Sequence, residues 1–178
     1  MVPLIQSPEH AKQIVSFAKF PPTGTRGLGS PFSMEKFTPE LTQLQYLQQA
    51  NGATLVVLQI ETASALKSVR EIAAVEGVDV LLVGPYDLGN SIGHPITSAK
   101  YDTELLDAIT SVREACKAAG KKSAIFCSSG EQAKEFADQG FDMVNTMTDV
   151  GAIGKAFGGA VEAASGAQAK QPGTGYAS

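Results

Sequence analysis

Residues 54–89 read TLVVLQIETASALKSVREIAAVEGVDVLLVGPYDLG, and this stretch decides the fold. Two short aliphatic runs, 54–60 and 79–83, flank a segment in which apolar residues between Ala65 and Ala73 recur at helical spacing. A strand, a helix and a strand in this order are typical of a parallel sheet whose strands are joined by crossover helices. The sequence therefore predicts an α/β fold.

The same alternation continues on both sides of this stretch. Further strands are expected at 2–6, 123–127 and 141–146, and helices at 8–19, 38–51, 65–73, 102–119, 130–139 and 149–163. Ser7-Pro8-Glu9 marks a helix start, because serine caps the helix and proline suits its first turn. Residues 20–37 are expected to form a long loop and residues 164–178 a disordered tail. Five parallel strands are thus predicted within residues 1–163.

The composition is ordinary for a soluble globular protein, with 43% apolar and 18% charged residues. No apolar run approaches the roughly 20 residues of a transmembrane helix, and residues 1–6 lack the features of a secretory signal. Cys116 and Cys127 have no metal-binding or redox spacing. We therefore expect a cytoplasmic protein with no membrane partner.

The charge pattern excludes an extended polyanion as partner. The net charge is -4, and the basic residues are scattered, with Lys121 and Lys122 as the only adjacent pair, so no nucleic-acid partner is predicted. A small anionic substrate remains compatible with this surface, because one local cation or metal ion can hold it.

Two acids follow predicted strands. Glu61 ends the first aliphatic run, and Asp87 follows the second. Ligands of parallel α/β folds collect at the carboxyl ends of strands, and consecutive strands are usually neighbours, so the two carboxylates could converge on a hard divalent cation. Alternatively, Glu61 favours a helix dipole and Asp87 forms a turn hydrogen bond without any metal. Spacing alone does not choose between these two interpretations.

Other polar groups near these acids have similar alternatives. Gln59 alternates with Glu61 and so points to the same side, towards a substrate oxygen or towards a buried water or backbone group. The backbone around Gly84, Pro85 and Tyr86 could receive a substrate carboxylate or form a plain tight turn. Arg26, in a glycine-rich loop, either approaches a ligand or makes a surface or structural ion pair.

The remaining candidate side chains are less well placed. His10 lies in the first predicted helix and His94 in the loop after Asp87, so both are expected to be exposed to solvent. Cys127 ends a strand, but with no obvious histidine partner it is expected to be a buried thiol rather than a nucleophile.

Four motifs in order resemble the HpcH/HpaI aldolase and citrate lyase family, nearest to its 2-keto-3-deoxy and 4-hydroxy-2-oxoacid aldolases. They are PPTGTRGLGS, YLQQAN, VLQIET and VEGVDVLLVGPYDLGNSIGHP, and the resemblance runs from residue 2 to about residue 163. It implies that the glutamate of the QIE motif and the aspartate of the GPxDL motif, here Glu61 and Asp87, bind Mg²⁺, Mn²⁺ or Co²⁺.

The resemblance also implies a reaction. Gln59 would lie beside the substrate, and the backbone of Gly84, Pro85 and Tyr86 would receive the carboxylate of pyruvate. The implied activity is retro-aldol cleavage of a 4-hydroxy-2-oxoacid to pyruvate and an aldehyde, in which a metal ion stabilises the enolate as a Lewis acid. Oxaloacetate decarboxylation needs no base for a hydroxyl and is expected as a second reaction. Gln59 and Arg26 are the candidate catalytic side chains.

The chain departs from the family in its length. The family fold is an eight-stranded (β/α)8 barrel, and the five predicted strands correspond to strands 4–8. The first three strands, with the usual histidine base and a substrate-orienting arginine, have no counterpart. Five strands cannot close a barrel and leave an exposed edge. Three explanations remain open, namely a fragment, a short protein that pairs with another chain and a non-catalytic metal- or pyruvate-binding relative.

Among these explanations we expect a fragment of an aldolase, with residues 1–163 as its partial barrel domain. The family commonly forms oligomers by exchanging C-terminal helices. The helix expected at 149–163 is therefore a candidate contact in a homo-oligomer.

Overall fold

The computed structural model describes residues 1–29, 40–98 and 100–166. Its four-stranded sheet is parallel throughout, in the order β1 (Val57–Ile60), β2 (Val80–Val83), β3 (Lys122–Ile125) and β4 (Met143–Val144). The described helices are α1 (Pro8–Ala18), α3 (Gln43–Ala53), α4 (Ala63–Lys67), α5 (Val69–Ala73), α6 (Pro85–Ile92), α7 (Thr103–Ala118), α8 (Gly130–Asp138) and α9 (Asp149–Ser165). The predicted α/β class with a parallel sheet is confirmed.

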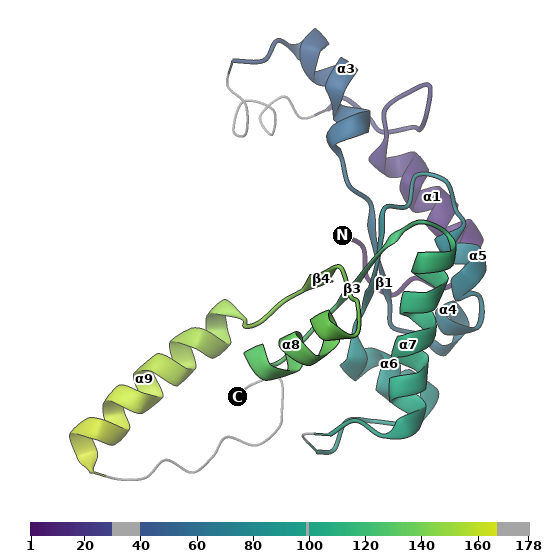
Figure 1. The fold of residues 1–178 in the computed structure, drawn as a ribbon. Coiled ribbons are helices and arrows are strands. Elements are labelled where there is room, and N and C mark those ends of the chain that lie inside the picture. Colours follow the sequence, from purple (N-terminus) through teal and green to yellow (C-terminus); the bar gives the residue numbers. More distant parts are fainter. Residues whose placement is uncertain (30–39, 99, 167–178) are drawn as a thin grey trace.

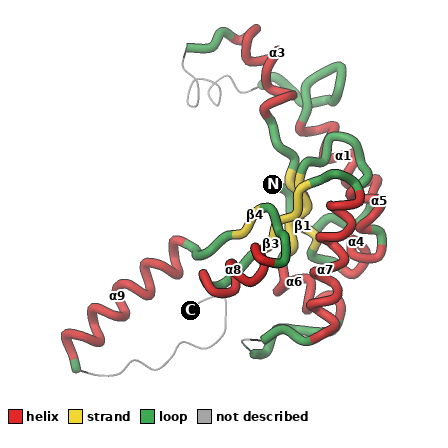
Figure 2. The backbone as a smooth tube through the Cα atoms, in the orientation of Figure 1, coloured by secondary structure: helices red, strands yellow, loops and turns green. Residues whose placement is uncertain are grey.

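Helices cover one face of the sheet. In Figure 1 and Figure 2, α1, α4, α5, α6 and α7 lie together on one side of the strands, and α9 extends away from them. Residues that alternate along the strands, such as Leu58, Leu81 and Ile125, belong to the main core between the sheet and these helices. None of the described helices has both the length and the apolar character needed to cross a membrane.

The opposite face carries a much smaller apolar cluster. Val57, Val80 and Ala124 are buried there, with Leu82 packed against them. The register aligns Gln59 with Leu82, Leu82 with Ala124 and Ala124 with Met143, so these side chains lie at one level of the same face. In a closed barrel this would be the interior face.

The strand predicted at 2–6 is reduced to a single bridge between Val2 and Leu58. Val2 donates to the carbonyl of Val57 and accepts from the amide of Gln59, both at 2.9 Å. The ladder stops there because Leu4, the next residue that would donate to β1, has a positive φ of 53° and donates to the Glu61 carboxylate instead. The residues that the structure describes therefore contain four strands and a bridge where five strands were predicted.

Helix α6 was not predicted, and the predicted bounds of the other helices differ most from the structure at three places. Helix α3 begins at Gln43 with a capping box between Thr42 and Gln45, and the predicted start at Thr38 lies outside the described residues. The helix predicted at 65–73 is two helices, α4 and α5, which meet at Ser68. Helix α9 ends at Ser165, and most of the predicted tail lies outside the described residues.

Candidate functional site

The strand register brings a second level of side chains together just beyond the strand ends. Glu61, Gly84, Phe126 and Asn145 each lie two residues after one of the aligned residues Gln59, Leu82, Ala124 and Met143. Because strand side chains alternate, this level faces the same side as the one below it. These residues line a cavity of about 320 Å³ together with Met1, Gln59, Leu82, Pro85, Tyr86, Met147 and Thr148.

Glu61 is the buried charge of this cavity. Its side chain is 6% exposed, and its two carboxylate oxygens accept hydrogen bonds from the Leu4 amide at 3.0 Å and from Nε2 of Gln59 at 2.9 Å. Burial raises the pKa of the Glu61 carboxyl, the Leu4 hydrogen bond lowers it, and the negative charge of Asp87 raises it again. The positive φ of Leu4 aims its amide at the carboxylate.

Gly84 leaves the space that the Glu61 carboxylate occupies. A Cβ atom at Gly84 would lie 2.8 Å from Cγ and 3.0 Å from Cδ of Glu61, which are too close for real contacts. Gly84 is also the N-cap of α6, and Pro85 begins that helix. The tight turn considered for this segment is therefore a helix N-terminus, where the N–H groups of the first turn are free of helical partners.

Asp87 lies in the first turn of α6, and its side chain is exposed. It does not line the cavity, but it lies close enough for its charge to act on Glu61. Within the described part of the chain, no lysine, arginine or histidine forms an ion pair with either acid. A buried carboxylate beside a second carboxylate fits a hard divalent cation, because carboxylate oxygens are the ligand atoms that such ions prefer.

Arg26 lies elsewhere. Its guanidinium stacks on the Phe20 ring at 4.5 Å, and Nη2 donates to the hydroxyl of Tyr46 at 3.0 Å. Arg26 does not line the cavity that contains Gln59 and Glu61. The contacts of Arg26 are those of a structural residue, so the structure does not bring this catalytic candidate to the other predicted residues.

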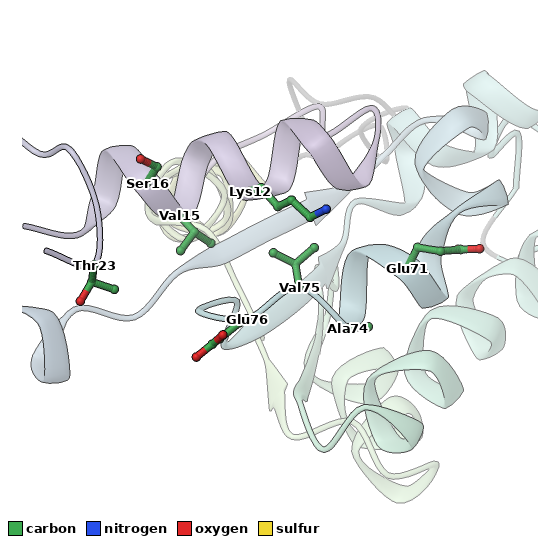
Figure 3. A pocket seen from close by; sticks show the side chains of 8 residues that line it. All are labelled: Lys12, Val15, Ser16, Thr23, Glu71, Ala74, Val75 and Glu76. Atoms are coloured by element: carbon green, nitrogen blue, oxygen red, sulfur yellow. The ribbon is translucent and has the colours of Figure 1, made fainter. Parts of the chain in front are cut away.

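Neither Glu61 nor Asp87 lines a second, larger cavity. It measures about 480 Å³ and lies between α1 and α5, as Figure 3 shows. Its lining is formed by Lys12, Val15, Ser16, Thr23, Glu71, Ala74, Val75 and Glu76. Glu76 belongs to the connection that enters β2, so this cavity lies towards the amino ends of the strands. Cavity size alone therefore does not locate the chemistry in this fold.

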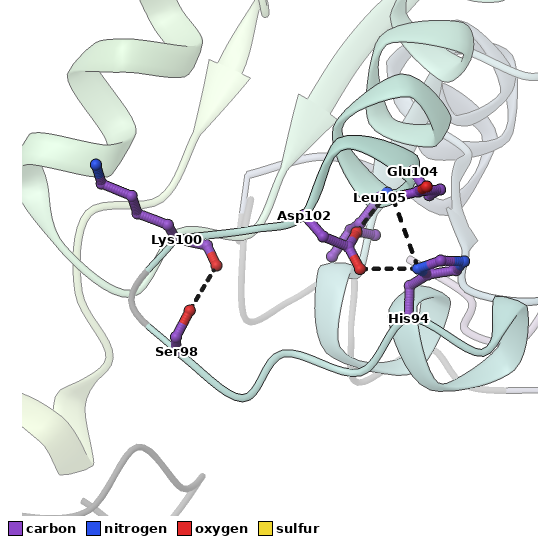
Figure 4. Close-up of polar contacts among 6 residues, drawn as sticks. All are labelled: His94, Ser98, Lys100, Asp102, Glu104 and Leu105. Atoms are coloured by element: carbon purple, nitrogen blue, oxygen red, sulfur yellow. Dashed lines mark hydrogen bonds and ion pairs between the residues drawn. The ribbon is translucent and has the colours of Figure 1, made fainter.

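A histidine and two acids come together between α6 and α7. Nδ1 of His94 lies 2.8 Å from Asp102 and 3.9 Å from Glu104, and Asp102 also accepts from the Leu105 amide at 2.9 Å (Figure 4). The Leu105 hydrogen bond and then His94 lower the pKa of Asp102. Because Asp102 is the N-cap of α7, these contacts tie α6 to α7. His94 was expected to be exposed to solvent, and its side chain is partly exposed.

Several groups at this site were not identified from the sequence, among them Phe126 and Asn145 in the cavity lining and the Leu4 amide that contacts Glu61. Phe126 and Asn145 could have been found by counting two residues beyond the aligned strand positions. The Leu4 amide had no sequence signal, since its role depends on a backbone conformation that is unusual for leucine.

A parallel sheet with helices on one face and two acids beyond neighbouring strands defines part of an α/β barrel with a candidate metal site. The chain matches the family "HpcH/HpaI aldolase/citrate lyase" over residues 1–156, and it belongs to that family. This confirms the resemblance found in its motifs.

Relatives of known name and structure agree with this assignment. The chain is 37% identical to the 2-dehydro-3,6-dideoxy-6-sulfogluconate aldolase of Pseudomonas putida, over 84% of the chain and 57% of that protein. It is 34% identical to the 4-hydroxy-2-oxo-heptane-1,7-dioate aldolase of Shigella sonnei, over 95% of the chain and 63% of that protein.

A solved family member has the same fold. An HpcH/HpaI aldolase/citrate lyase family protein of Burkholderia cenocepacia superimposes with a TM-score of 0.81 at 30% identity, over 93% of the chain and 64% of that structure. The chain thus spans about 57–64% of the length of these three relatives.

Proposed function

We propose that the chain carries the metal- and pyruvate-binding part of a divalent-metal-dependent aldolase, which cleaves a 4-hydroxy-2-oxoacid to pyruvate and an aldehyde. The observation that carries the proposal is the buried Glu61 carboxylate, which has Asp87 nearby and no described cation as partner. The aldolase names of the relatives support the same reaction class.

Each site residue has a role in this proposal. Glu61 and Asp87 hold Mg²⁺, Mn²⁺ or Co²⁺, and the ion, when bound, supplies a Lewis acid for the enolate charge that develops on pyruvate. Gln59 orients Glu61 through its 2.9 Å hydrogen bond and lies beside the 2-oxoacid. The N–H groups that follow Gly84 and Pro85, at Tyr86 and Asp87 in the first turn of α6, receive the substrate carboxylate.

The bond changes define what else the site needs. Cleavage breaks the bond between C3 and C4 of the 2-oxoacid, the C4 hydroxyl loses its proton as the aldehyde forms, and C3 then takes up a proton to give pyruvate. A base must accept the hydroxyl proton. Oxaloacetate has no such hydroxyl, and its decarboxylation needs no base of this kind. We therefore propose that this chain catalyses decarboxylation of oxaloacetate faster than aldol cleavage.

The proposal extends to assembly and location. Helix α9 has no buried residue, and Val150, Ile153, Phe157 and Val161 expose 57–75% of their surface along one stripe. This apolar stripe supports a homo-oligomeric contact, in a cytoplasmic protein whose partial barrel domain covers residues 1–163.

The test is pyruvate formation from oxaloacetate and from a 4-hydroxy-2-oxoacid, with and without Mn²⁺. Glu61→Ala and Asp87→Ala are each expected to abolish the Mn²⁺-dependent rate. Glu131→Ala, which removes an exposed acid of α8, is the matched control and should keep it. Pyruvate release equal to the metal-only background in the unaltered chain would contradict catalysis by this chain.

A second candidate function is metal and 2-oxoacid binding without turnover, completed by a partner chain. It is favoured by the exposed apolar residues Met1, Leu4 and Leu55 near the bridge to β1, which are 51–66% exposed. Saturable Mn²⁺ binding that depends on Glu61, without any pyruvate release, distinguishes this function from catalysis.

A further inference from the structure

We propose that Asn145 is a positioning residue that fixes Phe126 as one wall of the Glu61 cavity. The inference rests on the proposed function, because it concerns how that cavity holds a 2-oxoacid. Asn145, Phe126 and Glu61 line the same cavity.

The side chain of Asn145 takes the place of backbone hydrogen bonds between β3 and β4 beyond the end of the sheet. Strand β4 ends at Val144 and strand β3 at Ile125, so no further ladder bonds join these two strands. Oδ1 of Asn145 accepts from the amide of Cys127 at 2.7 Å, and its Nδ2 donates to the Cys127 carbonyl at 2.8 Å. Cys127 is fully buried, and buried backbone groups need such partners.

These two bonds place Phe126 between two fixed points. Before it, Ile125 pairs with Val144 in the sheet, and after it, Cys127 is held by Asn145. The amide of Phe126 itself donates to the Val83 carbonyl at 3.0 Å. The backbone of Phe126 is therefore held from both neighbouring strands, although β4 is only two residues long.

The fixed Phe126 ring in turn contacts the start of α6. It packs edge-on against Tyr86, with ring centroids 6.4 Å apart and an interplanar angle of 69°. Tyr86 belongs to the first turn of α6, whose N–H groups are proposed to receive the substrate carboxylate. Asn145 thus acts through Phe126 on the walls that contact a 2-oxoacid. Of the proposed metal ligands, Glu61 follows β1, and Asp87 shares α6 with Tyr86.

The chain contains a matched control for this arrangement. Asn51 forms the same pair of bonds with the backbone of Phe20, accepting from its amide at 2.7 Å and donating to its carbonyl at 3.0 Å. Asn51 and Phe20 do not line the Glu61 cavity. Asn51→Ala therefore removes an equivalent structural bond pair without altering the cavity wall.

The experiment compares Asn145→Ala, Asn145→Asp and Asn51→Ala in the full chain. Binding of Mn²⁺ is measured by electron paramagnetic resonance, and binding of pyruvate at saturating Mn²⁺ by calorimetry. Asn145→Ala is expected to raise the Kd of pyruvate about tenfold while the Kd of Mn²⁺ stays within about twofold. Asn145→Asp keeps the acceptor, but it sets an oxygen against the Cys127 carbonyl and adds a negative charge to the cavity, so its effect on pyruvate should be at least as large. Asn51→Ala should change neither Kd.

The outcomes separate this inference from the proposed function. If Asn145→Ala leaves the Kd of pyruvate unchanged, or if Asn51→Ala raises it equally, the positioning role is wrong while the proposed function stands. If the unaltered chain binds neither Mn²⁺ nor pyruvate, the proposed function is wrong. The positioning role is then decided by the nuclear Overhauser contact between the Phe126 and Tyr86 rings, which should be lost in Asn145→Ala and kept in Asn51→Ala. Its persistence in Asn145→Ala overturns the inference.

Discussion

Two buried charges, Lys19 and Glu61, have opposite surroundings. Lys19 is 7% exposed, and its Nζ donates to the carbonyls of Asn51 and Thr54, each at 2.6 Å. Those carbonyls lie at the carboxyl end of α3, where a positive charge is favourable. Glu61 is equally buried but has a second negative charge nearby. The chain itself therefore satisfies the charge of Lys19, while the surroundings of Glu61 favour a cation from outside.

The largest expected effect comes from removing the satisfied charge. Lys19→Met leaves two carbonyls of the α3 end without their donor, and it should lower the free energy of unfolding by about 3 kcal/mol. Urea unfolding measures this change. Lys12→Met removes an exposed lysine of α1, the helix that Lys19 follows as its C-cap, and should cost no more than about 0.5 kcal/mol. Equal losses in the two variants would mean that Lys19 contributes only as a surface lysine does.

A smaller loss is expected from crowding Glu61. Gly84→Ala places a methyl group against the Glu61 carboxylate, which should destabilise the fold by about 2 kcal/mol and weaken Mn²⁺ binding. Urea unfolding and Mn²⁺ titration measure the two effects. Gly27→Ala is the control, because a Cβ atom at Gly27 has no neighbour within 4 Å. Unchanged Mn²⁺ affinity in Gly84→Ala would show that the carboxylate can move without loss.

This contrast between the two charges was only partly predictable from the sequence. Alternating strands and helices, and the placement of Glu61 and Asp87 after strands, follow from local periodicity and capping, so they were predicted. The burial of Lys19 was not predictable, because its partner carbonyls lie 32 and 35 residues away. Arg26 had the same difficulty, since its partners Phe20 and Tyr46 are identified only once α3 is placed.

The pH dependence of stability tests Glu61 without any metal. Its pKa is raised above the ordinary 4.5, so the folded state holds the proton more tightly than the unfolded chain does. Its contribution to stability is present below pH 4.5 and is lost as the pH rises through the raised pKa. Glu61→Gln should remove this loss, as measured by unfolding in EDTA between pH 4 and 7. Glu114→Gln, at an exposed position, should leave it in place.

Other acids act in a different pH range. Lys122 and the Ser123 amide lower the pKa of Asp142 below 3.8, so its contribution to stability is present above that value and is lost as the pH falls. The two effects have opposite signs and lie on opposite sides of pH 4. A slope above pH 4.5 that is identical in the unaltered chain and in Glu61→Gln would contradict the assignment to Glu61.

The smallest expected effect is that of Asp87 on the pKa of Glu61. Asp87 is the neighbouring like charge, and Lys19 has no equivalent of it in this comparison. Asp87 is the last of three causes of the shift at Glu61, after burial and the Leu4 hydrogen bond. Asp87→Asn should therefore lower the pKa of Glu61 only slightly and leave it above 4.5, because burial is unchanged. Carbon-13 resonance of the Glu61 carboxyl, titrated without metal, measures the shift.

The control for this last variant is Asp107→Asn, which removes an exposed acid of α7 that does not act on Glu61. A return of the Glu61 pKa to its ordinary value in Asp87→Asn would make repulsion by Asp87, rather than burial, the main cause of the shift. The contrast with Lys19 would then rest on the neighbouring charge alone. A shift that survives in Asp87→Asn instead places its cause in the burial of the carboxylate, which packs against Gly84, because the Leu4 hydrogen bond lowers the pKa.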